Sequence, residues 1–70
     1  MTIRTVLRRN KNCRWVNIYQ QQELEGKTIK SLIAAYPMYC FKGDEYYTPM
    51  KVLAYGYDPV NDLLEIWVKR

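Results

Sequence analysis

The stretch that organises the chain reads Lys51-Val-Leu-Ala-Tyr-Gly-Tyr57, then Asp58-Pro-Val-Asn-Asp62, then Leu63-Leu-Glu-Ile-Trp-Val-Lys69. Its middle five residues are typical of a turn, because Pro59 presets φ at the second position and Asn61 tolerates the left-handed conformation. The two flanking segments therefore predict a β-hairpin. The predicted cross-strand pairs are Asp58 with Asp62, Gly56 with Leu64, and Ala54 with Ile66.

Side chains alternate across a strand, so this hairpin has two distinct faces. The small and aliphatic face, which we expect to be the floor of the core, carries Val52, Ala54, Gly56, Leu64, Ile66 and Val68. The opposite face carries Leu53, Tyr55, Tyr57, Glu65 and Trp67. The small residues of the first face leave room for another element to pack on it.

Length and composition are those of a small globular protein. The chain has 70 residues, of which 49% are hydrophobic and 26% charged, so we expect one compact domain spanning residues 1–70. No apolar run approaches the ~20 residues that a membrane span needs. The basic N-terminus also lacks the apolar core of a signal peptide. The sequence therefore predicts a cytoplasmic protein that does not enter a membrane.

The two cysteines, Cys13 and Cys40, lie far apart in the sequence. The chain has no histidine, and two thiols alone do not complete a four-ligand zinc site. A disulfide across this loop would stabilise the fold by roughly 3–4 kcal/mol in the chain-entropy model. Without a secretion signal we expect two reduced thiols, and we expect no cofactor or metal.

Positive charge is concentrated at the start of the chain. Residues 1–22 contain five basic and no acidic side chains, whereas residues 23–70 contain six basic and seven acidic ones. The net charge of +4 is therefore local, and it predicts a positive patch on an otherwise balanced surface.

The first twenty residues alternate in a way that predicts a second hairpin, with Asn10-Lys11-Asn12 as its turn. We place Leu7 opposite Val16, because this register gathers Ile3, Leu7, Val16 and Ile18 on one apolar face. The opposite face then holds Arg4, Val6, Arg8, Trp15, Asn17 and Tyr19, with Arg8 across from Trp15.

The period changes after Gly26. Ile29, Leu32, Ile33 and Tyr36 fall at i, i+3, i+4 and i+7, which predicts a short helix capped by Thr28 and ended by Pro37. A strand over the same residues is the alternative. Tyr39 to Thr48 then predicts a hairpin with Gly43-Asp44 as its loop, and Pro49 interrupts the pattern.

No set of catalytic residues emerges from these patterns. Gly26-Lys27-Thr28 resembles the end of a phosphate-binding loop, but Gln21 stands where that loop needs a glycine. No base is visible beside either cysteine. The carboxylates fall in turns, where aspartate is expected for structural reasons. The sequence therefore predicts a protein without enzymatic activity.

Aromatic side chains are unusually frequent, with seven tyrosines, two tryptophans and one phenylalanine. Strands favour such residues and a core needs bulk, but a sheet of this size cannot bury ten rings on one side. Arginines near rings suit nucleic acid, an acidic protein partner, or internal cation–π pairs without a ligand. The candidate binding residues are Arg4, Arg8, Arg9, Lys11, Arg14, Trp15, Tyr19, Tyr55, Tyr57 and Trp67.

We therefore predict an α+β fold: a small twisted antiparallel sheet of five or six strands, in the order strand, strand, short helix, strands, with the helix on one face. The alternative is a small barrel of the SH3 or OB type. The predicted function is a non-enzymatic module that docks on a larger protein or complex through an aromatic and basic surface and modulates it. By size and composition it is similar to inhibitors or adaptors encoded by phages and mobile elements. The alternative is a small basic protein that binds nucleic acid directly.

Overall fold

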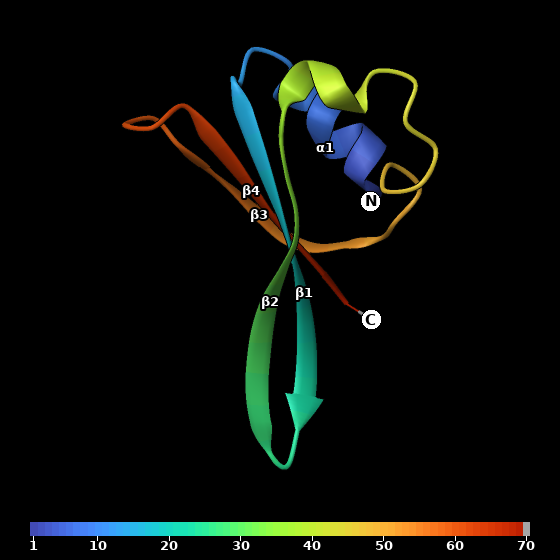
Figure 1. Cartoon of the computed structure of the whole chain (residues 1–70), viewed down its shortest axis with the longest axis vertical. Coiled ribbons are helices and arrows are strands. Elements are labelled where there is room, and N and C mark those ends of the chain that lie inside the picture. The colour runs from blue at the N-terminus through green and yellow to red at the C-terminus, as the bar shows by residue number, and fades with distance from the viewer. Residues whose placement is uncertain (70) are drawn as a thin grey trace.

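A computed structural model describes residues 1–69 as an α+β fold, with one short helix on a four-stranded mixed sheet that does not close into a barrel (Figure 1). The elements are α1 (Ile3–Arg9), β1 (Trp15–Leu24), β2 (Lys27–Pro37), the 3-10 helix η1 (Met38–Phe41), β3 (Val52–Asp58) and β4 (Leu63–Lys69). The strand order is β2-β1-β4-β3. Both hairpins are antiparallel, whereas β1 and β4 pair in parallel at the centre. The class is as predicted, but the described residues form four strands and not five or six.

Helix α1 replaces the predicted N-terminal hairpin. Ile3, Val6 and Leu7 are spaced as one side of a helix, and all three are buried. The side-chain oxygen of Thr2 accepts a hydrogen bond from the backbone amide of Thr5, as a helix N-cap does. Alternation alone had placed Val6 among the arginines, whereas the helix puts it in the core.

Tertiary hydrogen bonds hold the start of this short helix. The amides of Ile3 and Arg4 donate to the carbonyls of Met50 (2.9 Å) and Thr48 (3.0 Å). These amides lack partners within a helix, so the segment before β3 supplies them. A helix of 7 residues is too short to persist alone, which explains why local sequence did not reveal it.

Strand β2 occupies the stretch for which a helix was predicted. Ile33 is unpaired in a β-bulge, because Ile18 pairs with Ala34 while Tyr19 pairs with Leu32. A bulge shifts the side-chain alternation by one residue. Apolar residues before and after the bulge therefore do not share one alternating pattern, and their combined spacing resembles the period of a helix.

Residues 38–51 form no hairpin; they comprise η1 and an irregular segment. Gly43 has a positive φ of 79°. The carboxylate of Asp44 accepts hydrogen bonds from the amides of Tyr47 (2.9 Å) and Thr48 (3.1 Å). The predicted hairpin loop at Gly43-Asp44 is therefore wrong, and the carboxylate of Asp44 instead holds the irregular segment that follows it.

The C-terminal hairpin is confirmed, with its register displaced by one residue. Asp58 pairs with Leu63, and the left-handed residue is Asp62 (φ 51°) and not Asn61. Leu64, Ile66 and Val68 face the core as predicted. The face assignment of β3 was wrong between its bulge and the turn. Ala54 and Gly56 were predicted to face the core, but Tyr55 and Tyr57 lie on that side instead. The observed pairs there are Tyr57 with Leu64, Tyr55 with Ile66, Gly56 with Glu65, and Ala54 with Trp67.

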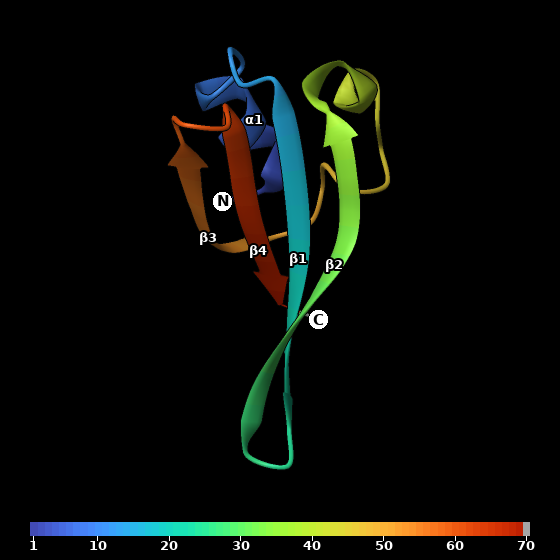
Figure 2. The same cartoon turned by 60° about the vertical axis from the view of Figure 1, so that its left-hand side comes forward.

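The core lies on one side of the sheet only. It contains Val16, Ile18, Leu64, Ile66 and Val68 from the central strands, and Ile3, Val6 and Leu7 from α1, with Phe41 from η1. Figure 2 shows α1 behind the sheet, with no described segment crossing the near side. One face of the sheet is therefore covered and the other is open.

The β1–β2 hairpin projects beyond the rest of the fold as an arm (Figures 1 and 2). Pairing between β1 and β4 ends at Gln21 and Lys69. Beyond that point β1 pairs only with β2, and exposed Leu24 and Ile29 lie in this part. Among the described residues, no helix is long and apolar enough to cross a membrane.

Candidate functional site

The open face of the sheet carries a row of rings on its two central strands. Trp15, Asn17 and Tyr19 alternate along β1 with Val16 and Ile18, whose side chains are fully buried on the other side. Trp67 of β4 lies beside Tyr19 in the parallel register. We call Trp15, Asn17, Tyr19 and Trp67, with Lys30 and Leu32 of β2, the open aromatic face.

Hydrogen bonds and stacking fix these rings. The indole Nε1 of Trp15 donates to Oδ1 of Asn17 at 2.9 Å, and Nδ2 of Asn17 donates to the hydroxyl of Tyr19 at 3.2 Å. The rings of Tyr19 and Trp67 stack with centroids 5.6 Å apart and planes 19° apart. Rings held in this way lose little conformational freedom when a partner binds.

Charge on the open aromatic face is mixed. Nζ of Lys30 lies 5.3 Å from the centroid of the Trp67 ring, a cation–π contact. Glu65 shares this face because it alternates with buried Leu64 and Ile66 along β4. Leu32 pairs with Tyr19 and is 54% exposed. The face therefore combines apolar rings with isolated charges of both signs.

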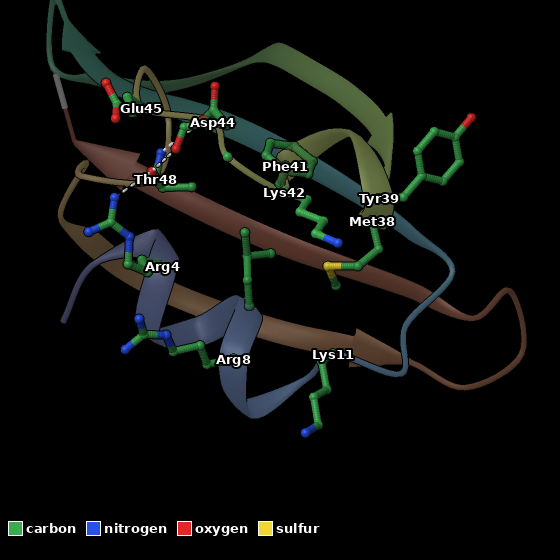
Figure 3. A pocket seen from close by; sticks show the side chains of 12 residues that line it. Arg4, Arg8, Lys11, Met38, Tyr39, Phe41, Lys42, Asp44, Glu45 and Thr48 are labelled. Carbon is green, nitrogen blue, oxygen red and sulfur yellow. Dashed lines mark hydrogen bonds between the residues drawn. The ribbon is translucent and has the colours of Figure 1, made fainter.

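A second candidate surface lies on the opposite side of the molecule, around α1. Figure 3 shows the side chains that line a groove between α1 and the segment that follows β2. The volume of this groove is about 810 Å³. We call it the basic groove. It is lined by Arg4, Leu7, Arg8, Lys11, Met38, Tyr39, Phe41, Lys42, Gly43, Asp44, Glu45 and Thr48.

The ten residues predicted as a binding surface do not lie together. Trp15, Tyr19 and Trp67 are on the open aromatic face, whereas Arg4, Arg8 and Lys11 line the basic groove. The predicted contact of Arg8 with Trp15 across a hairpin is wrong, because Arg8 belongs to α1. The roles of all ten residues in binding stay predictions.

Of the four remaining residues, Arg9 ends α1, Arg14 directly precedes β1, and Tyr55 and Tyr57 lie on the covered side of the edge strand β3. Arg9 and Tyr57 line a smaller hollow of about 310 Å³ next to Cys13. The hydroxyl of Tyr57 donates to Oδ1 of Asp62 at 2.7 Å, and this bond is the main reason that the pKa of Tyr57 is raised. Tyr55 pairs with Ile66 on the covered side, and the side chain of Arg14 is exposed.

Sequence reasoning missed several residues at both surfaces. Lys30 and Leu32 were assigned to a helix, and Lys42 to a hairpin, so neither surface included them. Asn17 was placed on the correct face, but its bridging hydrogen bonds depend on rotamers that alternation does not predict. Tyr19 and Trp67 lie side by side because β1 and β4 pair in parallel, and these two residues are 48 positions apart in the sequence.

Both cysteines are free thiols. Cys13 is buried, and this burial raises its pKa, with a smaller contribution from the negative charge of Asp62. Cys40 is exposed in η1. The chain matches no family model, and no similar protein was found among curated proteins or solved structures.

Proposed function

We propose that this protein is a non-enzymatic module that docks on a larger protein through the open aromatic face and modulates it. The observation that supports the proposal is the fixed row of Trp15, Tyr19 and Trp67 on a sheet face that no described segment covers. Tryptophan and tyrosine are, together with arginine, the residues most enriched where single side chains dominate binding energy.

Mixed charge on this face favours a protein partner over nucleic acid. A strand of nucleic acid needs cations for its phosphates next to rings for its bases. The arginines of α1 lie on the other side of a sheet from Trp15, Tyr19 and Trp67. A partner that contacts the rings therefore meets Lys30 and Glu65 and not the arginines, a balance that suits a protein surface.

The test is affinity capture from extracts of the source organism with wild type and ring variants. Trp15→Ala combined with Trp67→Ala should weaken retention of a specific protein by more than about 30-fold, since an anchoring ring contributes over ~2 kcal/mol. Tyr46→Ala is the matched control, because Tyr46 is 72% exposed and belongs neither to this face nor to the lining of the basic groove. Melts must show that all variants fold. Equal retention of the captured protein by wild type and the ring variant would contradict the proposal.

Direct nucleic-acid binding is the alternative, and the convergence of Arg4 and Arg8 on one groove favours it. Three or four phosphate contacts would lower affinity by roughly 40- to 150-fold between 50 and 200 mM salt. Titration with single- and double-stranded oligonucleotides at several salt concentrations measures this slope. Tight, salt-sensitive binding that Arg4→Ala with Arg8→Ala abolishes would replace the protein-docking proposal. Absence of binding at low salt would eliminate the alternative.

A further inference from the structure

The basic groove has a composition that the proposed function does not use. We propose that it binds an acidic peptide segment of a protein partner, in extended conformation, with one apolar side chain buried on the groove floor. This site lies on the covered side of the sheet, away from the open aromatic face (Figures 2 and 3). The inference is therefore independent of the proposed function.

The floor of the groove is apolar. Leu7 of α1 and Phe41 of η1 are 8% and 6% exposed, and both line the groove. Met38 also lines it and is partly buried against the core. Methionine adapts its shape to different partners because its side chain is unbranched and flexible. The floor can therefore accept an aliphatic or aromatic anchor without a preformed pocket for one residue type.

The rim carries cations on both walls, although the wall with Lys42 also carries Asp44 and Glu45 at one end. Arg4 and Arg8 are exposed on one side of α1, and Lys42 reaches in from the opposite wall (Figure 3). Nη2 of Arg4 donates to the hydroxyl of Thr48 at 3.3 Å, which holds this guanidinium beside Thr48. Lys11, in the turn that follows α1, also lines the groove.

The spacing of the arginines suits an extended acidic chain. Residues four apart on a helix are displaced by ~6 Å along its axis, and alternate side chains of an extended strand are ~6.6–6.8 Å apart. Carboxylates at alternate positions of the peptide would thus meet Arg4 and Arg8 in turn. Side chains between them would point the other way, toward Leu7 and Phe41.

Two features of the groove disfavour nucleic acid as its occupant. Glu45 is exposed at one end beside Asp44, where its charge would repel a phosphate backbone. The ring of Phe41 is buried, so Tyr39 alone among the aromatic lining residues offers an open ring for a base. An acidic peptide can avoid Glu45 through its own sequence, whereas a phosphate backbone carries charge at every position.

The test uses methyl-¹³C methionine labelling and a ten-residue probe peptide with Glu at alternate positions, Ser between them and one central Phe. The Met38 methyl lines the groove, whereas Met1 and Met50 do not, so only Met38 should shift. A probe with Ser in place of Phe should bind at least tenfold more weakly. Arg8→Gln with Lys42→Gln should also lower affinity at least tenfold.

The controls separate this site from general charge attraction and from the open aromatic face. Lys69→Gln removes an exposed lysine outside the groove and should change affinity by less than threefold. Trp15→Ala with Trp67→Ala should leave probe binding unchanged. An unmoved Met38 methyl at millimolar probe, or equal binding of the Ser probe, would overturn the proposal. Tighter binding of ten-nucleotide oligothymidine would overturn it in favour of nucleic acid.

Discussion

Ile66 and Glu65 are neighbours on β4 with opposite surroundings. The side chain of Ile66 is fully buried under α1, whereas Glu65 points to the open face. Strand β4 is held between β1 and β3. Because its backbone cannot easily move to fill the space, truncation of Ile66 leaves a cavity in the core. This pair therefore reports directly on which side of the sheet is the core.

We expect Ile66→Ala to lower the free energy of unfolding by about 2–5 kcal/mol. Glu65→Ala should change it by less than about 0.5 kcal/mol, as a change outside the core. Denaturant melts of both variants give the comparison. A larger loss in the Glu65 variant would mean that the two faces of β4 are assigned the wrong way round.

The two thiols should differ in reactivity. The thiolate is the reactive form, and burial raises the pKa of Cys13 as well as shielding it. Cys40 is exposed. A maleimide added to the folded protein near pH 7 should therefore label Cys40 first, and Cys13 only after unfolding, as peptide mass mapping would show. Faster labelling of Cys13 would contradict its placement against the core.

At the scale of elements, the arm formed by β1 and β2 depends on its turn. Glu25 and Gly26 both have positive φ, 53° and 77°, as in a two-residue type I′ loop. The arm receives no support from β4 beyond Gln21. Its local stability therefore rests largely on this turn and on the β1–β2 ladder.

Gly26→Ala should destabilise the arm by about 1 kcal/mol, because a side chain at this φ is strained. No atom lies within 4 Å of the position of the added Cβ, so conformational strain is the cause and not a clash. Hydrogen exchange should accelerate at Gln22 to Lys30, while β4 stays protected. Unchanged exchange in the arm would show that the turn adopts another conformation.

The elements differ in how far sequence could predict them. The C-terminal hairpin was found because its turn residues and its alternation agree. Helix α1 was missed because Ile3, Thr5 and Leu7 also alternate, and the bonds that hold its start come from Thr48 and Met50. Strand β2 was mistaken for a helix because the bulge at Ile33 shifts its pattern.

At the scale of the whole molecule, the parallel pairing of β1 with β4 brings together the rings of the open aromatic face. The alternation of Trp15, Asn17 and Tyr19 against Val16 and Ile18 was predictable, and so was that of β4. That these faces join could not be inferred locally, because the pairing is non-local. The predicted single basic and aromatic surface was divided for a different reason: Arg4, Arg8 and Arg9 lie on a helix that covers the other face.

The central claim is that a protein partner contacts the open aromatic face. Photo-cross-linking in cells of the source organism tests it, with p-benzoylphenylalanine in place of Leu32, which is 54% exposed beside Tyr19, or of Val60, which is 88% exposed at the turn before β4. We expect a nuclease-resistant adduct to one host protein from position 32 and none from position 60. An adduct from position 60 alone, or one that nuclease removes, would contradict the account.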